Sequence, residues 1–215
     1  MHRSRAVSLV FVLSLILTGC AGPSQQYGFS KTDGVYFALP NSWYQISSKS
    51  LNAHEATSTT AGAAEKLALV KWQVGYSTDP KIGPKEVFNF EPTDSPIAFA
   101  RVRSLFPDEI NAVSYNTLRD LIVPITDWVT NPNAATPEFS IIDDYEVAEK
   151  NARGVRTIFS FTKNGRAQTV DQTAMVSTDR QTIYIFIIRC SDACYAKNKV
   201  EMTKISNSFT VRGAK

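Results

Sequence analysis

The residues best suited to chemistry in this sequence are three cysteines and two histidines. His54 is the histidine that lies outside the N-terminal segment, and the chain has no G-x-S-x-G motif that could supply a serine nucleophile to it. We therefore interpret His54 as an exposed loop residue. Zinc sites need several Cys and His ligands, and phosphate loops need clustered glycines, but neither pattern occurs. The sequence predicts no enzyme activity, no metal and no cofactor.

Cys20 directly follows a segment with the layout of a signal peptide. A short basic stretch over residues 1–5 precedes an uninterrupted apolar run from Ala6 to Leu17. A helix needs about 20 apolar residues to span the hydrocarbon core, so this run is too short for a permanent membrane helix. The sequence Leu17-Thr18-Gly19-Cys20 resembles the lipobox of bacterial lipoproteins.

This lipobox resemblance implies that the Cys20 thiol is acylated and that the chain is cleaved before it. Residues 1–19 would be a lipoprotein signal peptide, and acyl chains such as palmitate would hold the protein at the extracytoplasmic face of the cell membrane. The alternative is an ordinary secretory signal with a coincidental cysteine. Residues 20–33 are small and polar, and they predict a flexible tether before one globular domain over residues 34–215.

Cys190 and Cys194 remain as an even pair in a chain expected to be exported. They flank Ser-Asp-Ala at the junction of an expected strand and an expected helix, where residues i and i+4 come close enough for a disulfide. A redox-active dithiol is the alternative, although its usual spacing is C-x-x-C. We expect a structural disulfide between Cys190 and Cys194.

Four aromatic residues on expected strands are candidates for a ligand pocket. They are Trp43, Trp72, Tyr76 and Phe99. Aromatic side chains on the apolar face of a strand more often belong to the core, so both interpretations stay open.

The charge of the chain argues against a polyanionic partner. It has 23 Lys and Arg against 20 Asp and Glu, and Arg3 and Arg5 lie in the expected signal peptide. The remainder is close to neutral and its basic residues are scattered, which disfavours binding to nucleic acid.

Alternating apolar and polar residues predict a mainly antiparallel sheet. Val35–Leu39 and Trp43–Ile46 predict a hairpin, because Pro40-Asn41-Ser42 between them is typical of a turn. Gln181–Arg189 has bulky apolar residues on both faces and should be a central strand flanked on both sides. The other expected strands cover residues 67–76, 97–105, 139–146, 155–162, 168–177 and 208–211, of which 139–189 forms an antiparallel meander.

Two helices are expected. Ser114 is a suitable N-cap for a short helix over Tyr115–Val123, and Tyr195–Ile205 should form a helix that packs across the sheet. Four prolines within Asp79–Pro96 exclude a long helix or a central strand there.

Several short segments resemble the LpqN-type lipoproteins of actinobacteria over roughly residues 34–212. The segments are Val35-Tyr-Phe-Ala-Leu-Pro-Asn-Ser-Trp43, Gln172-Thr-Ala-Met-Val-Ser177, Ile185-Phe-Ile-Ile-Arg-Cys190, Cys194-Tyr195 and Ile205-Ser-Asn-Ser-Phe-Thr-Val211. The resemblance implies a PsbP-like α+β fold, an α/β/α sandwich with helices packed on both faces of the antiparallel sheet. It brings no catalytic motif, and residues 79–96 have no counterpart in it.

These observations favour a lipid-anchored envelope protein that acts as a non-catalytic binding or interaction module. Its partners would be the membrane, through the lipid on Cys20, and an envelope protein or lipid. One alternative is a carrier of a small apolar or lipidic ligand between sheet and helix, and a further alternative is a hydrolase with an unrecognised site.

Overall fold

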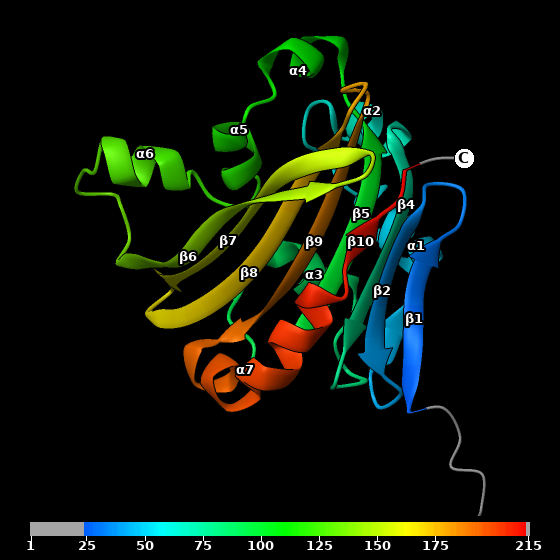
Figure 1. Ribbon diagram of the computed structural model, residues 1–215. Helices are drawn as coiled ribbons and strands as arrows, with labels where there is room; N and C mark the ends of the chain where they lie inside the picture. Colours follow the sequence, from blue (N-terminus) through cyan, green and yellow to red (C-terminus); the bar gives the residue numbers. More distant parts are fainter. Residues whose placement is uncertain (1–23, 214–215) are drawn as a thin grey trace, which may run out of the picture.

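The main layer of the molecule is a sheet of seven strands in the computed structural model, which describes residues 24–213 (Figure 1). In chain order the strands are β3 Tyr44–Ile46, β4 Val70–Ser77, β5 Ile97–Ser104, β6 Phe139–Glu149, β7 Ala152–Lys163, β8 Arg166–Ser177 and β9 Thr182–Ser191. Their spatial order is β3-β4-β5-β9-β8-β7-β6, and every neighbouring pair is antiparallel. The predicted antiparallel sheet and its meander, β6–β9, are confirmed.

Strand β9 lies between β5 and β8, and each of its residues is buried. Because side chains alternate along a strand, its isoleucines 183, 185 and 187 enter one core, whereas Tyr184, Phe186 and Ile188 enter another. The predicted central position of this strand is confirmed. Two separate layers of structure must cover the sheet as a result.

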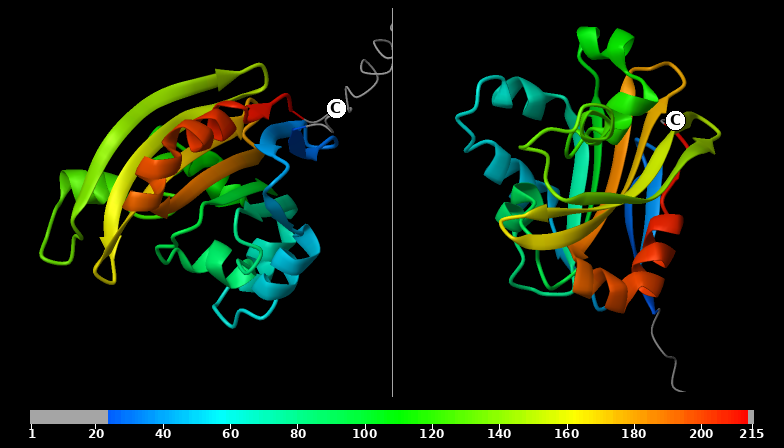
Figure 2. Two further views of the ribbon diagram at one scale, coloured as in Figure 1. Left: turned by 90° about the horizontal axis from the view of Figure 1, so that it is seen from below. Right: turned by 90° about the vertical axis from the view of Figure 1, so that its left-hand side faces the viewer.

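The first covering layer is a small sheet together with the C-terminal helix. β1 Gln25–Ser30, β2 Val35–Pro40 and β10 Thr210–Val211 form this sheet in the order β1-β2-β10, and helix α7 Asp192–Asn207 lies beside it. Figure 2 shows the blue strands and the red helix on the same side of the main sheet. The helix expected over residues 195–205 is therefore confirmed, with a longer N-terminal part.

Two predictions at the N-terminal end of the domain are wrong. The flexible tether expected over residues 20–33 gives way to β1, which pairs with β2 along its whole length from Gln25 to Ser30. Gly28 permits this pairing, because a Cβ at this position would lie 2.2 Å from the ring of Phe37 in β2. The expected hairpin of 35–39 with 43–46 is also wrong, because β2 belongs to the small sheet and β3 pairs with β4 in the main sheet.

The second covering layer consists of short helices. They are α1 Ser48–Glu55, α2 Ala63–Ala68, α3 Pro84–Asn89, α4 Pro107–Ala112, α5 Tyr115–Arg119 and α6 Ile125–Thr130. Leu51, Val87, Leu118 and Ile125 from four of these helices join the core on this face. Helices thus cover both faces of the sheet, which confirms the predicted α+β architecture. None of the described helices combines the length and the apolar character needed to cross a membrane.

A buried ion pair connects the main sheet to helix α7. Arg156 in β7 donates from Nε and Nη2 to the two carboxylate oxygens of Asp171 in β8, at 2.8 and 2.7 Å. The two side chains are 6% and 0% exposed, so water screens their attraction very little. Arg156 also donates to the side chain of Asn207 at the end of α7. The pair therefore fixes the helix against two strands.

We expect Asp171→Asn to lower the free energy of unfolding by about 3–5 kcal/mol, because it leaves the Arg156 guanidinium buried without its counter-charge. Arg166→Gln is the matched control, because it breaks the pair with Asp94, whose side chains are 52% and 78% exposed; its cost should stay below about 1 kcal/mol. Urea unfolding of both variants measures the difference. Equal costs would show that the buried pair does not stabilise the sheet.

Candidate functional site

The four aromatic residues proposed as a pocket do not meet in one place. Trp43 and Tyr76 are buried in the core beneath the small sheet, and Trp72 packs against that core. Phe99 lies in the core on the opposite face of the main sheet. A single pocket lined by all four is therefore excluded, because the sheet itself separates them.

The space between the main sheet and α7 is filled with side chains. Phe37 from the small sheet lies 5.0 Å, centroid to centroid, from Phe186 of β9, and Phe186 stacks on Phe209 at 5.1 Å. Met202 and Ile205 of α7 are buried in the same core. A ligand carried between sheet and helix would have to displace this packing, which argues against the carrier hypothesis in that form.

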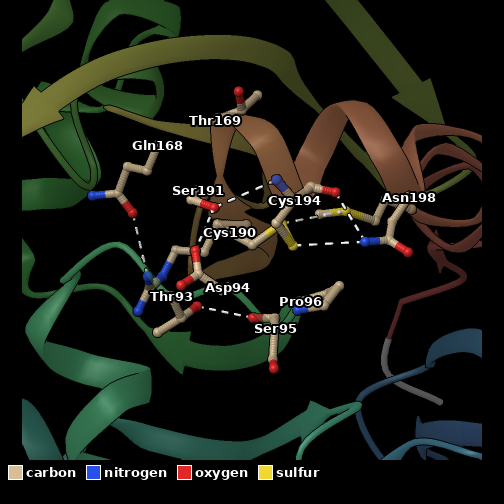
Figure 3. Close-up of a disulfide and its surroundings, with 12 residues drawn as sticks. Thr93, Asp94, Ser95, Pro96, Gln168, Thr169, Cys190, Ser191, Cys194 and Asn198 are labelled. Carbon is tan, nitrogen blue, oxygen red and sulfur yellow. Dashed lines mark hydrogen bonds between the residues drawn. A yellow bond between two sulfur atoms is a disulfide. The ribbon is translucent and has the colours of Figure 1, made fainter. Parts of the chain in front are cut away.

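Cys190 and Cys194 form a disulfide at the point where β9 passes into α7, as predicted (Figure 3). Their Cα atoms are 5.8 Å apart. Both residues are buried, and the side-chain amide of Asn198, one helical turn further on, donates to the carbonyl oxygen of Cys194 at 2.9 Å. A buried disulfide within the core is typical of a structural role, because an exchange partner must reach a sulfur atom. Cys20, the expected lipidation site, lies outside the described residues.

Ser191, between the two cysteines, joins this corner to the proline-rich segment. Its hydroxyl caps α7 by accepting from the Cys194 amide and donates to Asp94 at 2.9 Å, and its amide donates to the carbonyl oxygen of Thr93 at 2.7 Å (Figure 3). The disulfide corner and residues 93–94 therefore form one unit.

Arg189 fixes the rest of that segment. Its side chain is 1% exposed, and it donates to the carbonyl oxygens of Glu86 and Glu91, the former at the start of α3. The guanidinium also lies over the Phe90 ring, 4.7 Å from its centroid. Burial lowers the pKa of Arg189 to about 10, so it remains charged at neutral pH. Helix α3 is thereby placed against the sheet.

A cavity of about 390 Å³ opens where α3 meets α1, α2 and β5. Its wall includes His54 and Glu55 from α1, Lys66 from α2, Phe88 from α3 and Arg101 from β5. His54 is exposed, as predicted, but it lies near the end of α1 and not in a loop, and its ring stacks on Phe88 at 5.8 Å. The Arg189 contacts hold α3, and α3 presents Phe88 to the cavity.

Arg101 is held in place by aromatic and polar neighbours. The guanidinium carbon lies 5.4 Å and 5.2 Å from the ring centroids of Phe88 and Phe99. Nη2 donates to Glu55 at 2.7 Å and Nε donates to Gln73 at 3.0 Å. Burial lowers the pKa of Arg101, and the Glu55 carboxylate opposes that effect. The orientation of this cation is thus fixed before any ligand arrives.

Two cationic side chains that line the cavity keep donors without a protein acceptor. Across residues 24–213, Arg101 Nη1 donates to no other residue, and the Lys66 ammonium forms no hydrogen bond or salt bridge. The buried Gln73 is already committed, because its amide donates to Asn52 and Glu55. The arrangement suits a ligand that brings its own acceptors, such as a carboxylate or a phosphate.

Sequence analysis identified Phe99 and His54 in this region but missed Arg101, Lys66 and Phe88. A lone arginine on a half-buried strand gives no pattern that separates it from a solvent-facing one. The available signal was the concentration of prolines in residues 79–96, which indicated an irregular segment without showing which strand it covers. Within the same described range, no group of three or more His, Cys, Asp or Glu side chains is placed to hold a metal ion.

Comparison with known proteins gives structural likenesses alone. No family model and no curated protein matches the sequence. Among solved structures, cyanobacterial PsbP from Synechocystis sp. PCC 6803 is 13% identical, with 92% of this chain and 99% of that one covered and a TM-score of 0.49. LpqN of Mycobacterium tuberculosis, described as involved in cell envelope biogenesis, is 15% identical over 87% and 90% with a TM-score of 0.46.

The Ran-binding protein Mog1p of Saccharomyces cerevisiae is 9% identical over 88% and 96%, with a TM-score of 0.43. At these values the likenesses say nothing of what this chain binds. Membership of the LpqN-type family stays a prediction, whereas the α+β class follows from the strand pairing itself.

The double variant Cys190→Ser with Cys194→Ser should unfold with a free energy lower by about 1–3 kcal/mol, because it removes a short covalent loop from the unfolded chain. Far-UV circular dichroism should show the native fold. The reduction potential of the native disulfide should lie below about −300 mV, as for structural disulfides. A value near −200 mV would instead support a redox role.

Proposed function

We propose that this chain is a lipid-anchored protein of the cell envelope whose folded domain is a non-catalytic binding module. The lipid on Cys20 would hold it at the extracytoplasmic face of the membrane. The domain would recognise an acidic group of an envelope partner at the cavity between α1, α2 and α3. The observation that carries the recognition step is the Arg101 guanidinium, fixed between two phenylalanines with a free donor.

Support for the anchor comes from the first twenty residues. An apolar run that is too short to remain in the bilayer is followed at once by Leu17-Thr18-Gly19-Cys20. Two or three acyl chains bury enough methylenes to make such an anchor effectively permanent, at about 0.8 kcal/mol for each methylene.

Cys20→Ser should abolish acyl labelling and leave either uncleaved precursor or protein shed from the membrane. Metabolic labelling with a radioactive fatty acid, followed by fractionation of the envelope, measures both effects. Acyl labelling and membrane retention equal to those of the unchanged chain would contradict the anchor.

Support for binding over hydrolysis comes from the state of the cavity side chains. Hydrolysis by a nucleophile needs a base within hydrogen-bond reach of a hydroxyl or thiol. The His54 ring is instead stacked on Phe88, and among the described residues its nitrogens form no hydrogen bond to a hydroxyl. The Glu55 carboxylate is paired with Arg101 at 2.7 Å. His54 and Glu55 are thus engaged with Phe88 and Arg101. The positive charge at the cavity comes from Arg101 and Lys66.

Lys66→Glu should weaken partner binding about tenfold, because it places a negative charge opposite an acidic group. A photo-crosslinking residue at Ala61, which also lines the cavity, would report binding in intact envelopes as a discrete adduct. The control is Lys49→Glu, which makes the same charge change on the exposed surface of α1, away from the cavity lining.

The control variant should give the same adduct yield as the unchanged chain. Equal yields from Lys66→Glu and Lys49→Glu would contradict recognition at this cavity. An adduct that forms equally when the crosslinker is placed at Val129, on α6, would show that contact is unspecific.

A further inference from the structure

The outer side of the small sheet and the exposed side of α7 form one continuous surface, here called the β1–α7 surface. Gln25, Ala38 and Pro40 from the sheet meet Val200 and Lys204 from the helix across a groove of about 590 Å³. The register of β1 on β2 places Tyr27 beside Ala38 and Phe29 beside Tyr36 along the same side. This surface begins at the first strand residue of the folded domain.

Large apolar side chains project from this surface into solvent. Val200 is 87% exposed, Tyr27 61% and Phe29 45%. The alternation of β1 explains their direction, because Gly28 between the two aromatic residues points inward against Phe37. No segment within residues 24–213 covers them, and a cluster of exposed apolar side chains at one place is typical of a contact site.

Cations accompany the aromatic rings. The Lys31 ammonium lies 5.9 Å from the centroid of Phe29, and the guanidinium of Arg212 lies 5.3 Å from that of Tyr36. Phe29 and Tyr36 stack on each other at 6.3 Å. Each cation therefore sits over an apolar ring with its charge available to an external anion.

The groove beside α7 adds further positive charge. Lys197 and Lys204 line it together with one acid, Glu201. The Glu201 carboxylate accepts from the indole Nε1 of the buried Trp43 at 3.1 Å, so it is already used within the domain. Over the whole surface, four cations, Lys31, Lys197, Lys204 and Arg212, face two acids, Glu201 and the largely buried Asp33. The β1–α7 surface therefore carries a net positive charge that is complementary to an anionic layer.

The distance to the expected anchor is short. Four residues separate Cys20 from Gln25, and the five residue-to-residue steps between them span at most about 18 Å in any conformation. An acylated Cys20 would therefore keep the start of β1 within this distance of the bilayer. Lipid headgroups would be the most concentrated anions near the β1–α7 surface.

We propose that the β1–α7 surface lies on the anionic headgroup layer of the membrane, so that the anchored domain has a fixed orientation. This inference rests on the proposed lipid anchor. Tyr27 and Phe29 enter the interfacial region, as amphipathic aromatic side chains do, and the lysines and Arg212 contact lipid phosphates. The α1–α3 cavity, on the other side of the main sheet, is then directed away from the bilayer (Figure 2).

Tryptophan quenching by brominated phosphatidylglycerol tests this orientation. The acylated chain, with its acylation confirmed by intact mass, is reconstituted into vesicles as Phe29→Trp. We expect the emission that this residue adds to fall to about half or less, because interfacial side chains lie within reach of brominated acyl chains. The unchanged chain supplies the background from Trp43, Trp72 and Trp128.

Val129→Trp is the matched control, because Val129 is 53% exposed on α6, far from β1 (Figure 1). Its added emission should be unaffected. Lys31→Glu with Arg212→Glu should restore most of the emission at position 29, through repulsion from the anionic lipid. Quenching that is absent at 29, equal at 29 and 129, or unchanged by the charge reversal would overturn the proposed orientation.

Two further outcomes are distinguishable. If intact mass shows no acyl chain, the anchor itself has failed, and the orientation that rests on it fails with it. If position 29 is protected only by a second copy along the β1 edge, light scattering will show dimers and brominated lipid will not quench, which also overturns the proposal.

Discussion

Strand β9 leaves none of its residues exposed, and this burial on both faces constrains the rest of the fold. A sheet that is apolar on one side needs one covering layer, but this sheet needs two. The small sheet with α7 supplies the first layer and the short helices supply the second. The disulfide stands where β9 passes into α7, so it fixes the angle at which the first layer begins.

The charged residue at the end of this strand explains the course of the proline-rich segment. Arg189 is buried near the C-terminal end of β9, and an unpaired buried cation is costly. Backbone carbonyl oxygens of Glu86 and Glu91 satisfy it, which holds α3 and the residues directly after it against the sheet. Prolines are tolerated in such a segment. They have no backbone N–H group, but the sheet does not require a hydrogen-bond donor from these positions. This contact places α3, and therefore Phe88, in the wall of the cavity between α1, α2 and α3.

The sequence allowed strands β4–β9 to be predicted because most of them carry their own alternating pattern, and β9 carries a run of bulky apolar residues on both faces. Strand β1 could not be predicted, because Gln25–Ser30 has few apolar residues and is held by backbone pairing with a neighbour. The Arg101 site was equally hidden. Glu55, Phe88 and Arg101 are far apart in the chain, and their meeting depends on where Arg189 places α3. The local sequence pattern identifies individual strands and helices. The Arg101 site, in contrast, forms only where several of these elements meet.

Strand β5 shows how one sheet serves two different surfaces. Ala98 and Ala100 point toward the small sheet, and their small side chains leave room for large ones such as Phe37 and Phe186. On the opposite side, Phe99 and Arg101 are large and support the cavity. The two sides share a backbone but no side chain, so charge changes at the cavity need not disturb the β1–α7 surface. A domain built in this way can contact a bilayer on one face while it binds a partner on the other.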